Sequence, residues 1–343
     1  MVMKRYDVII IGAGPGGLKC AEVLSQSDKS VLLLEKNEEI GPKVCAGGLT
    51  RKSFRYLDPP DRIIEKAFDR VIFKTFKRET ILSFGENLLY TINRKNLGQW
   101  QLSKLKNTAV EIRTGELVTE INSDCIVTNK SGKIGYSHLV GADGSNSIVR
   151  RYLGLETKLM GVAFHYLAPT KKYNDIELFF DSRLFHSWYS WIFPCGEYSS
   201  IGYGYFPKII SSKKAREGFD QWTIKSKIDI SGGKFQAHPL NSDYQGYRFG
   251  NVFLVGDAAG LVSGFTGEGI YQALVSGEEA ARSIINPLHK SRRVSELRRE
   301  ARLHHFMLRI VLLAGPLRNF LFNLVTFSVR SKFIARTLLR ILT

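Results

Sequence analysis

The chain of 343 residues is long for one domain and short for three, so its length favours about two domains. Its composition, 44% hydrophobic and 24% charged residues, is that of an ordinary globular protein. The four cysteines (Cys20, Cys45, Cys125 and Cys195) are widely separated and form no C-x-x-C pair, a spacing that fits neither a disulfide framework nor a zinc site. No charged and apolar leader precedes the first structured residues, and we expect a cytoplasmic protein.

The net charge of +17 is concentrated at the C-terminal end of the chain. Residues 288–343 carry 12 Lys and Arg against two Glu, which is more than half of the excess. A basic excess is typical of proteins that bind nucleic acid, an anionic membrane surface or acidic substrates. Because the same residues include many large apolar side chains, we expect peripheral membrane contact and no nucleic-acid partner.

The N-terminal 35 residues have the pattern of a strand–turn–helix–strand unit. A β-rich segment, Tyr6–Ile11, leads into a glycine-rich turn, an apolar helical pattern follows, and Val31–Leu34 reads as a second buried strand. The turn has the G-x-G-x-x-G spacing, which allows a tight turn and close approach to a pyrophosphate at a helix N-terminus. Glu35 ends the second strand at the spacing of a ribose-binding carboxylate, although a surface glutamate is the alternative. We therefore expect dinucleotide binding by Gly12, Gly14, Gly16, Gly17 and Glu35.

Further along, the chain alternates between glycine clusters and strand patterns. Short strands are predicted at Arg113–Ile121, Ser123–Val127 and Gly132–Leu139, before the glycine-rich residues 141–145. Between about Leu159 and Phe206 the pattern is aromatic and alternating, as in an antiparallel sheet with one covered face; strands are expected at 176–180, 187–194 and 199–205. A buried strand at Asn251–Val255 then leads to two more glycine clusters, 256–260 and 264–269, and to a helix at about Ile270–Ile285.

This order predicts a nucleotide-binding domain that is interrupted by a sheet domain and completed afterwards. The fold class expected is α+β or α/β: a Rossmann-like domain, an inserted antiparallel-sheet substrate domain and a C-terminal helical region. The boundaries expected are residues 1–158 (with a substrate-side segment at 50–95), 159–245, 246–287 and 288–343.

Three glycine motifs in this order resemble the geranylgeranyl reductase family, which has the p-hydroxybenzoate hydroxylase-like fold. Gly141-Ala-Asp-Gly-Ser145 with Arg150 is similar to the family's D-G motif, and Gly256-Asp-Ala-Ala-Gly260 with Gly264–Ile270 is similar to its G-D motif. The resemblance implies FAD as the cofactor. It also implies that Asp257 meets the ribityl chain or pyrophosphate, that Gly269 and Ile270 lie against the flavin, and that Asp143 holds the loop near it.

Two weaker matches extend the resemblance. Lys43-Val-Cys-Ala-Gly-Gly-Leu49 resembles the cysteine-containing flavin loop of the family, which implies FAD contacts for Cys45, Ala46 and Gly48. Arg94 matches a family arginine near the cofactor, and Val118 matches a position whose backbone meets the adenine. The family commonly has Phe-Asp shortly after the arginine, where this chain has Leu97-Gly98.

Tyr189-Ser-Trp-Ile-Phe-Pro194 is similar to the Y-x-W-x-F-P signature of geranylgeranyl reductases. Alternation along a strand would point Tyr189, Trp191 and Phe193 to one face, where they could floor a site for isoalloxazine or a prenyl chain. Ordinary core packing is the alternative for each residue alone. His165 could line the same cavity, although a hydrogen-bonded structural histidine is the commoner case.

The C-terminal residues combine apolar and basic positions. The segment 306–327 is interrupted by Arg309, Arg318 and Gly315-Pro316, so it is not a continuous membrane span. An apolar helical stripe with interspersed arginines is typical of helices at an anionic membrane interface, and packing over the sheet domain is the alternative. The stripe comprises Leu317, Phe320, Leu321, Leu324 and Val325, continued by Phe333, Ile334, Leu338 and Ile341.

The function expected is a FAD-dependent reductase that saturates isoprenoid double bonds of a prenyl lipid or quinone-like substrate, with Cys45 as the catalytic proton donor. The reductant expected is NAD(P)H or a protein electron donor, since there is no second dinucleotide motif. We expect no metal site and a monomeric protein. The alternatives are a flavin-dependent monooxygenase or halogenase on the same fold, and a membrane-associated flavoprotein that reduces a quinone.

Overall fold

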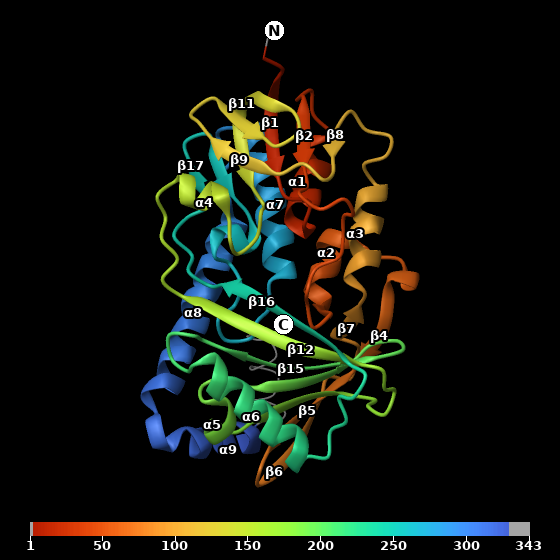
Figure 1. Cartoon of the computed structure of the whole chain (residues 1–343), viewed down its shortest axis with the longest axis vertical. Helices are drawn as coiled ribbons and strands as arrows, with labels where there is room; N and C mark the ends of the chain where they lie inside the picture. The colour runs from red at the N-terminus through yellow and green to blue at the C-terminus, as the bar shows by residue number, and fades with distance from the viewer. Residues whose placement is uncertain (1–2, 329–343) are drawn as a thin grey trace.

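The computed structural model describes residues 3–328 and contains a nucleotide-binding-type sheet stacked end to end with a second sheet (Figure 1). Within these residues the first sheet has eight strands, in the order β17-β18-β11-β1-β2-β8, with the β9–β10 hairpin attached to β11. The pairs β18–β11, β11–β1, β1–β2 and β2–β8 are parallel. The strands are β1 (Arg5–Ile11), β2 (Val31–Leu34), β8 (Glu111–Arg113), β9 (Val118–Ile121), β10 (Cys125–Thr128), β11 (Gly132–Gly141), β17 (Arg248–Phe249) and β18 (Val252–Leu254).

Both faces of this sheet are buried, which explains the nearly continuous apolar sequence of its strands. Along β1, Ile9 and Ile11 belong to one hydrophobic cluster, whereas Val8 and Ile10 belong to another on the opposite face. The helices α1 (Pro15–Leu24) and α7 (Ile270–Ile285) pack closely against each other. A Cβ on Gly277 of α7 would lie 2.2 Å from the carbonyl oxygen of Gly16, so this crossing requires glycine.

The second sheet has seven strands, in the order β16-β12-β15-β14-β13-β5-β6. All of its neighbouring pairs are antiparallel except β13–β5, which is parallel. The strands between residues 159 and 245, where the antiparallel sheet was expected, pair only in antiparallel fashion. The parallel pair joins them to β5, which comes from far earlier in the chain. The strands are β5 (Arg70–Thr75), β6 (Arg78–Ser83), β12 (Met160–Ala168), β13 (Ile176–Phe180), β14 (Ser190–Pro194), β15 (Ser199–Tyr205) and β16 (Lys234–Asn241).

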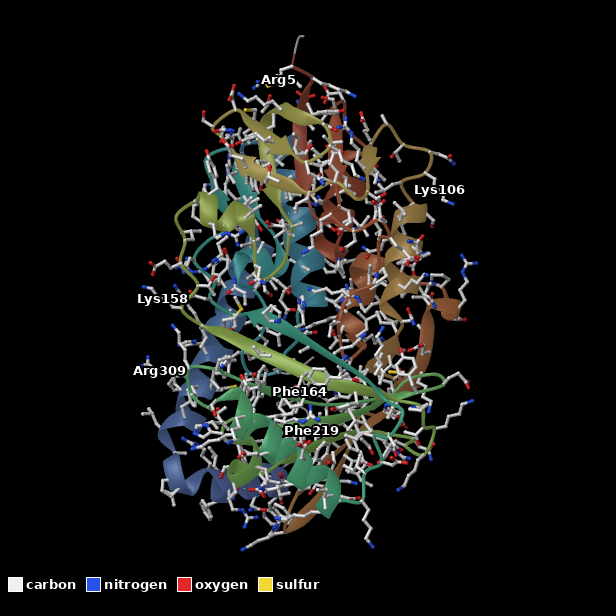
Figure 2. The ribbon with its side chains drawn as sticks, viewed as in Figure 1. Arg5, Lys106, Lys158, Phe164, Phe219 and Arg309 are labelled. Carbon is white, nitrogen blue, oxygen red and sulfur yellow. The ribbon has the colours of Figure 1, made fainter. Side chains whose placement is uncertain are left out.

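Helices α5 (Ser182–Phe185) and α6 (Ser212–Lys225) cover one face of this sheet, and Figure 2 shows Phe164 of β12 beside Phe219 of α6. The ring centroids of this pair are 5.2 Å apart. A smaller three-stranded sheet, β3-β7-β4, joins the two parts. Its strands and the remaining helical segments are β3 (Gly48–Thr50), β4 (Ile64–Phe68), β7 (Leu89–Ile92), η1 (Arg51–Ser53), α2 (Phe54–Leu57), η2 (Asp61–Ile63), α3 (Arg94–Ser103), α4 (Ile148–Tyr152) and η3 (Gly256–Ala259).

The expected Rossmann-like fold class is confirmed, but one expected strand was wrong. Residues 113–121 form the end of β8 and a separate strand, β9, rather than one strand. Gly115 between them has a positive φ of 63°, and the chain turns there. As a result β8 pairs with β2, and β9 pairs with β10.

The C-terminal region consists of α8 (Arg292–Leu313), the short helix η4 (Gly315–Leu317) and α9 (Arg318–Ser328). Figure 1 shows α8 running along one side of the molecule from the first sheet to α9 beside β6. Within residues 3–328 no single helix is long and apolar enough to cross a membrane; α8 and the segment 315–328 pass that test only together, with a bend of 105°. Phe333, Ile334, Leu338 and Ile341 lie outside the described residues.

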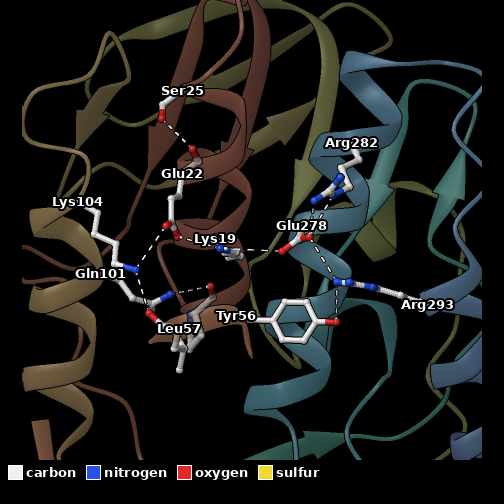
Figure 3. A network of polar contacts seen from close by, with 11 residues as sticks. Lys19, Glu22, Ser25, Tyr56, Leu57, Gln101, Lys104, Glu278, Arg282 and Arg293 are labelled. Atoms are coloured by element: carbon white, nitrogen blue, oxygen red, sulfur yellow. Dashed lines mark hydrogen bonds and ion pairs between the residues drawn. The ribbon is translucent and has the colours of Figure 1, made fainter. Parts of the chain in front are cut away.

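A network of charged side chains fixes α1, the helix that follows the first glycines of the glycine motif (Figure 3). Lys104, which follows α3 directly, pairs with Glu22 of α1 at 3.4 Å, and Glu22 also pairs with Lys19 at 3.3 Å. Lys19 lies 4.0 Å from Glu278 of α7, which in turn pairs with Arg293 of α8 at 3.5 Å. Side chains of three other helical segments, at the end of α3, in α7 and in α8, therefore help to hold α1 in place.

Candidate active site

The glycine turn between β1 and α1 is built for close backbone contacts on one side and an open space on the other. Gly12 has a φ of 101°, and a Cβ there would lie 2.4 Å from the carbonyl oxygen of Ala142. A Cβ on Gly17 would lie 2.0 Å from the carbonyl oxygen of Gly12, whereas nothing lies within 4 Å of one on Gly14. Gly14 is the N-cap of α1, with no side-chain cap and no acidic residue in the first turn. The N–H groups and positive dipole end of α1 are thus suited to a pyrophosphate, which fits the FAD that the motif implies.

Glu35 lies beside this turn. Its carboxylate accepts hydrogen bonds from the N–H of Ala13 at 2.9 Å and from the N–H of Asn37 at 3.0 Å. Its backbone carbonyl accepts a hydrogen bond from the N–H of Glu116, two residues before Val118. The side chain of Val118 itself is buried in the core. The structure therefore brings Glu35 and the segment of Val118 together with the glycine turn.

A cavity of about 470 Å³ runs from this turn into the second sheet. It is lined at one end by residues after β2 and around α7, and at the other by apolar residues of β5, β6, β13, β14, α8 and α9. Eleven of the residues singled out from the sequence line it: Cys45, Ala46, Gly48, Arg94, His165, Tyr189, Trp191, Phe193, Asp257, Gly269 and Ile270. The four motif glycines, Glu35, Val118 and Asp143 do not line it, although the neighbouring Pro15 does.

The polar end of the cavity contains a cluster centred on Asp257. The Lys43 ammonium lies 2.9 Å from the carboxylate, and the Ser145 hydroxyl donates to the same oxygen at 3.2 Å. Burial raises the pKa of Asp257, but the charge and hydrogen bond of Lys43 act together with His238 and the Ser145 hydroxyl, and their combined effect holds the pKa below its ordinary value. The Nε of Arg94 also lies in this region, buried and with no hydrogen-bond partner among the described residues. An anionic, hydroxyl-rich ligand such as the ribityl phosphate part of FAD fits these groups.

His238 of β16 lies at the same end of the cavity. Burial lowers its pKa to about 4, and the nearby charge of Lys43 adds to the shift. Its Nε2 is buried and has no hydrogen-bond partner among the described residues. The imidazole is therefore neutral at physiological pH.

The Asp143 side chain does not line the cavity and instead binds backbone N–H groups of its own loop. One oxygen of its carboxylate accepts hydrogen bonds from the N–H groups of Ile148 at 2.6 Å and Val149 at 3.3 Å. Burial raises its pKa. The side chain thus holds the loop between β11 and α4, which packs against Gly12.

Cys45 is half-buried at the wall of the cavity. Its sulfur accepts a hydrogen bond from the N–H of Gly47 at 3.4 Å, so the loop's own backbone orients the thiol. The other three cysteines are buried and do not line the cavity.

The aromatic residues around β14 form one wall, as the alternation predicts. The ring centroids of Tyr189 and Trp191 are 6.4 Å apart, as are those of Trp191 and Phe193, and all three rings line the cavity. Tyr189 precedes β14 rather than lying in it. Its hydroxyl donates to the carbonyl oxygen of Thr266 at 2.5 Å, so the wall also supports the glycine loop 264–269.

His165 is a hydrogen-bonded histidine of the buried sheet that also lines the cavity. Its Nδ1 is 2.7 Å from the Ser200 hydroxyl, and its Nε2 is 3.1 Å from the Gln236 side-chain oxygen. Burial lowers its pKa. Both ring nitrogens are satisfied, which is the structural alternative considered above.

Sequence reasoning missed three polar groups of the site. Lys43 lies in the flavin-loop motif but its partner Asp257 is 214 residues away, and His238 has no motif around it. Glu268, in the glycine loop, accepts a 2.6 Å hydrogen bond from Thr50 and pairs with Lys52 at 2.8 Å. No group of three or more His, Cys, Asp or Glu in residues 3–328 could hold a metal ion.

Comparison with known proteins identifies the family of the chain. The family model described as "FAD binding domain" matches residues 5–299. A geranylgeranyl diphosphate reductase of Rhodobacter capsulatus is 28% identical, over 81% of this chain and 74% of the relative. A digeranylgeranylglycerophospholipid reductase of Methanocaldococcus jannaschii is 26% identical, over 81% of this chain and 78% of the relative.

Solved structures share the fold. A geranylgeranyl bacteriochlorophyll reductase-like protein of Thermoplasma acidophilum has a TM-score of 0.79 at 18% identity, covering 98% of this chain and 96% of that one. The p-nitrophenol 4-monooxygenase of Pseudomonas putida has a TM-score of 0.75 at 16% identity, covering 98% and 97%. The resemblance to geranylgeranyl reductases is confirmed by the named relatives. The chain therefore belongs to the FAD binding domain family and is a FAD-dependent oxidoreductase whose relatives include geranylgeranyl reductases.

Proposed function

We propose that this protein saturates isoprenoid double bonds of a prenyl lipid or a related quinone-like substrate. The observation that carries the proposal is a cavity lined both by residues of the flavin motifs, such as Cys45, Asp257 and Ile270, and by many apolar side chains of the second sheet, α8 and α9. An apolar chamber with few polar groups suits a hydrocarbon chain rather than a polar metabolite. The names of the reductases to which the chain is similar support the same substrate class.

In this proposal the chain holds FAD through residues at three places. The N-terminus of α1 and Glu35 hold the pyrophosphate and ribose, Asp257 and Arg94 hold the ribityl side, and the loop with Gly269 and Ile270 lies against the ring. Reduced FAD supplies a hydride equivalent when bound. The protein positions the alkene in the apolar chamber and excludes water from it.

An isolated alkene accepts hydride poorly, so a proton must reach the other alkene carbon as the hydride is transferred. We assign this proton to the Cys45 thiol, which lines the cavity. The N–H of Gly47 donates to the sulfur and would stabilise the thiolate left after transfer.

The test replaces Cys45 by serine. Cys45→Ser should keep the yellow bound cofactor but reduce turnover on a geranylgeranyl substrate by roughly a hundredfold or more, the range for removing a proton donor. Mass spectrometry of the product under anaerobic conditions, with the flavin reduced by dithionite, measures this. The control is Cys125→Ser, because Cys125 lies on β10 and does not line the cavity. Unchanged turnover in Cys45→Ser would refute the role of the thiol.

The electron donor is proposed to be NAD(P)H or a reduced electron-transfer protein. Substrate-stimulated oxidation of NADH or NADPH by the purified protein tests the first of these.

We also propose a monomer that is cytoplasmic and touches membranes peripherally through its C-terminal helical region, where large apolar side chains are exposed.

A second candidate is a flavin-dependent monooxygenase or halogenase. The similarity of fold to p-nitrophenol 4-monooxygenase favours it. Oxygen consumption coupled to substrate-stimulated NAD(P)H oxidation, with an oxygenated or halogenated product, would support this candidate. Saturation of the alkene without oxygen would support the reductase.

A further inference from the structure

Helix α9 packs against the protein through its polar side. The Asn319 side chain accepts a hydrogen bond from the N–H of Ser182 at 2.7 Å, and Asn323 accepts one from the Thr75 hydroxyl at 2.7 Å. Phe322 and Thr326 are buried in the same contact with β5 and β6. For a helix on the surface of a water-soluble protein, the expected arrangement is the opposite, with polar residues outward.

The outward side of the bend between α8 and α9 is apolar. Leu317 is 67% exposed and Phe320 is 68% exposed. We define the elbow surface as the exposed apolar residues Phe306, Ile310, Leu313, Leu317, Phe320, Leu324 and Val325. Arg318 fixes the bend, because its guanidinium donates to the carbonyl oxygens of Val311 and Leu312 at 2.9 Å each. These hydrogen bonds fix the geometry of the bend at which the exposed apolar residues of α8 and α9 meet.

Basic and apolar residues alternate on the exposed face of α8 near the bend. Arg302, Phe306, Arg309 and Leu313 are spaced four, three and four residues apart, which places them on one helix face. All four are exposed, and Figure 2 shows Arg309 on the outer side of α8. A helix face that combines arginines with large apolar side chains is typical of helices at the interface of an anionic bilayer.

The cavity opens at the elbow surface. Among the described residues that line the cavity, Ile310 and Val325 are the two exposed ones, at 43% and 41%. Ile310 belongs to α8 and Val325 to α9, so the opening lies between the two helices. Met307 of α8 and Leu321 and Phe322 of α9 also line the cavity, so both helices contribute further apolar side chains to it.

We propose that the elbow surface docks on an anionic lipid bilayer, and that a prenyl chain enters the cavity from the bilayer between Ile310 and Val325. Exposing each methylene group of such a chain to water costs free energy, and direct passage from the bilayer into the cavity avoids this cost. The entry route rests on the proposed reduction of prenyl lipids, whereas docking deepens the proposed membrane contact and can be measured without any substrate.

Charge argues against other occupants of this surface. Two copies of the chain joined face to face by a two-fold axis would bring their rows of arginines together. Residues 329–343 carry four Lys and Arg and no acidic residue, so folding them over the elbow surface would also add like charge. An anionic membrane neutralises these groups instead.

Docking is tested by flotation of the full-length FAD-bound protein with vesicles of phosphatidylcholine and phosphatidylglycerol, and with phosphatidylcholine alone. We expect binding to the anionic vesicles, weakened about tenfold or more in Phe320→Glu/Leu324→Glu because charge is placed at the interface. Arg302→Gln and Arg309→Gln should each weaken it by roughly fivefold. The control is Ile224→Glu, because Ile224 is an exposed apolar residue of α6 away from the elbow surface. A retained flavin absorption spectrum shows that each variant is folded.

Three outcomes would overturn docking: equal binding by the wild type and the double glutamate variant, a wild-type dimer that this variant separates into monomers, or vesicle binding only after residues 329–343 are removed.

Entry is tested with Val325→Trp, which narrows the opening. We expect a lower ratio of turnover on vesicle-embedded to detergent-dispersed prenyl lipid, with vesicle binding retained; an unchanged ratio overturns the entry route. Absence of reduction on any prenyl lipid would instead reject the proposed function, since vesicle binding is measured without substrate.

Discussion

The acid sensitivity of the fold should depend on His238. This imidazole lies in the polar end of the cavity near Lys43 and Arg94, and burial with these positive charges lowers its pKa from 6.5 to about 4. The folded protein therefore binds the proton less readily than the unfolded chain does. Stability contributed by neutral His238 is complete above about pH 6.5 and is lost as the pH falls toward about 4, where the folded form is also protonated.

The magnitude follows from the two pKa values. At about pH 4.5 the unfolded chain is almost fully protonated at this position and the folded protein is mostly not, which lowers the free energy of unfolding by about 2.5 kcal/mol relative to about pH 7.5. His238→Gln removes this contribution. Urea unfolding of the FAD-free wild type and variant at the two pH values measures it, and their difference isolates His238 from other groups such as Asp257 that titrate in acid. If both proteins lost the same free energy of unfolding between the two pH values, the assignment of a depressed pKa to His238 would be refuted.

Two further predictions concern the framework of the FAD site. Gly277→Ala would push a methyl group against the carbonyl oxygen of Gly16, so it should lower the free energy of unfolding by about 1–3 kcal/mol and weaken FAD binding. Urea unfolding measures the first effect and FAD titration measures the second. The control is Gly196→Ala, whose added methyl group meets only ordinary contacts. Stability equal to that of the control would contradict the close α1–α7 crossing. Lys43→Met leaves the Asp257 carboxylate without its ion pair and should cost about 1–2 kcal/mol near neutral pH, less than a fully buried pair because the Lys43 side chain is 30% exposed. This cost should disappear as the pH falls below about 4 and Asp257 becomes protonated, so a pH-independent cost in urea unfolding would argue against the pair.

The local elements of the first sheet could be predicted from the sequence. The strand Val31–Leu34 and the helix Ile270–Ile285 have the expected bounds. Their patterns are local: a buried strand is a short apolar run, and a glycine turn before a helix needs only neighbouring residues. The errors occurred where a local pattern was ambiguous, as at Gly115, where a turn divides what looked like one strand.

The candidate site was predicted where it consists of motifs and missed where it consists of long-range pairs. The flavin-loop cysteine, Arg94 and Asp257 were identified from a resemblance, and the cavity brings them together with the aromatic residues of β14. Lys43 and His238 could not be assigned, since their partners come from other elements. The parallel pairing of β5 with β13 was missed for the same reason.

The sequence by itself determined the glycine turn, the alternating aromatic strand and the basic, apolar character of the C-terminal region, because these depend on residue type and short spacing. Only the tertiary structure decided which side of α9 faces outward. The stripe that includes Leu317, Phe320 and Leu324 is the kind that usually packs inward, but Asn319 and Asn323 find hydrogen-bond partners on the sheet domain and turn the apolar side out. The spacing of residues along a helix shows which side chains share a face. The partners available in the folded protein decide which of the faces is buried.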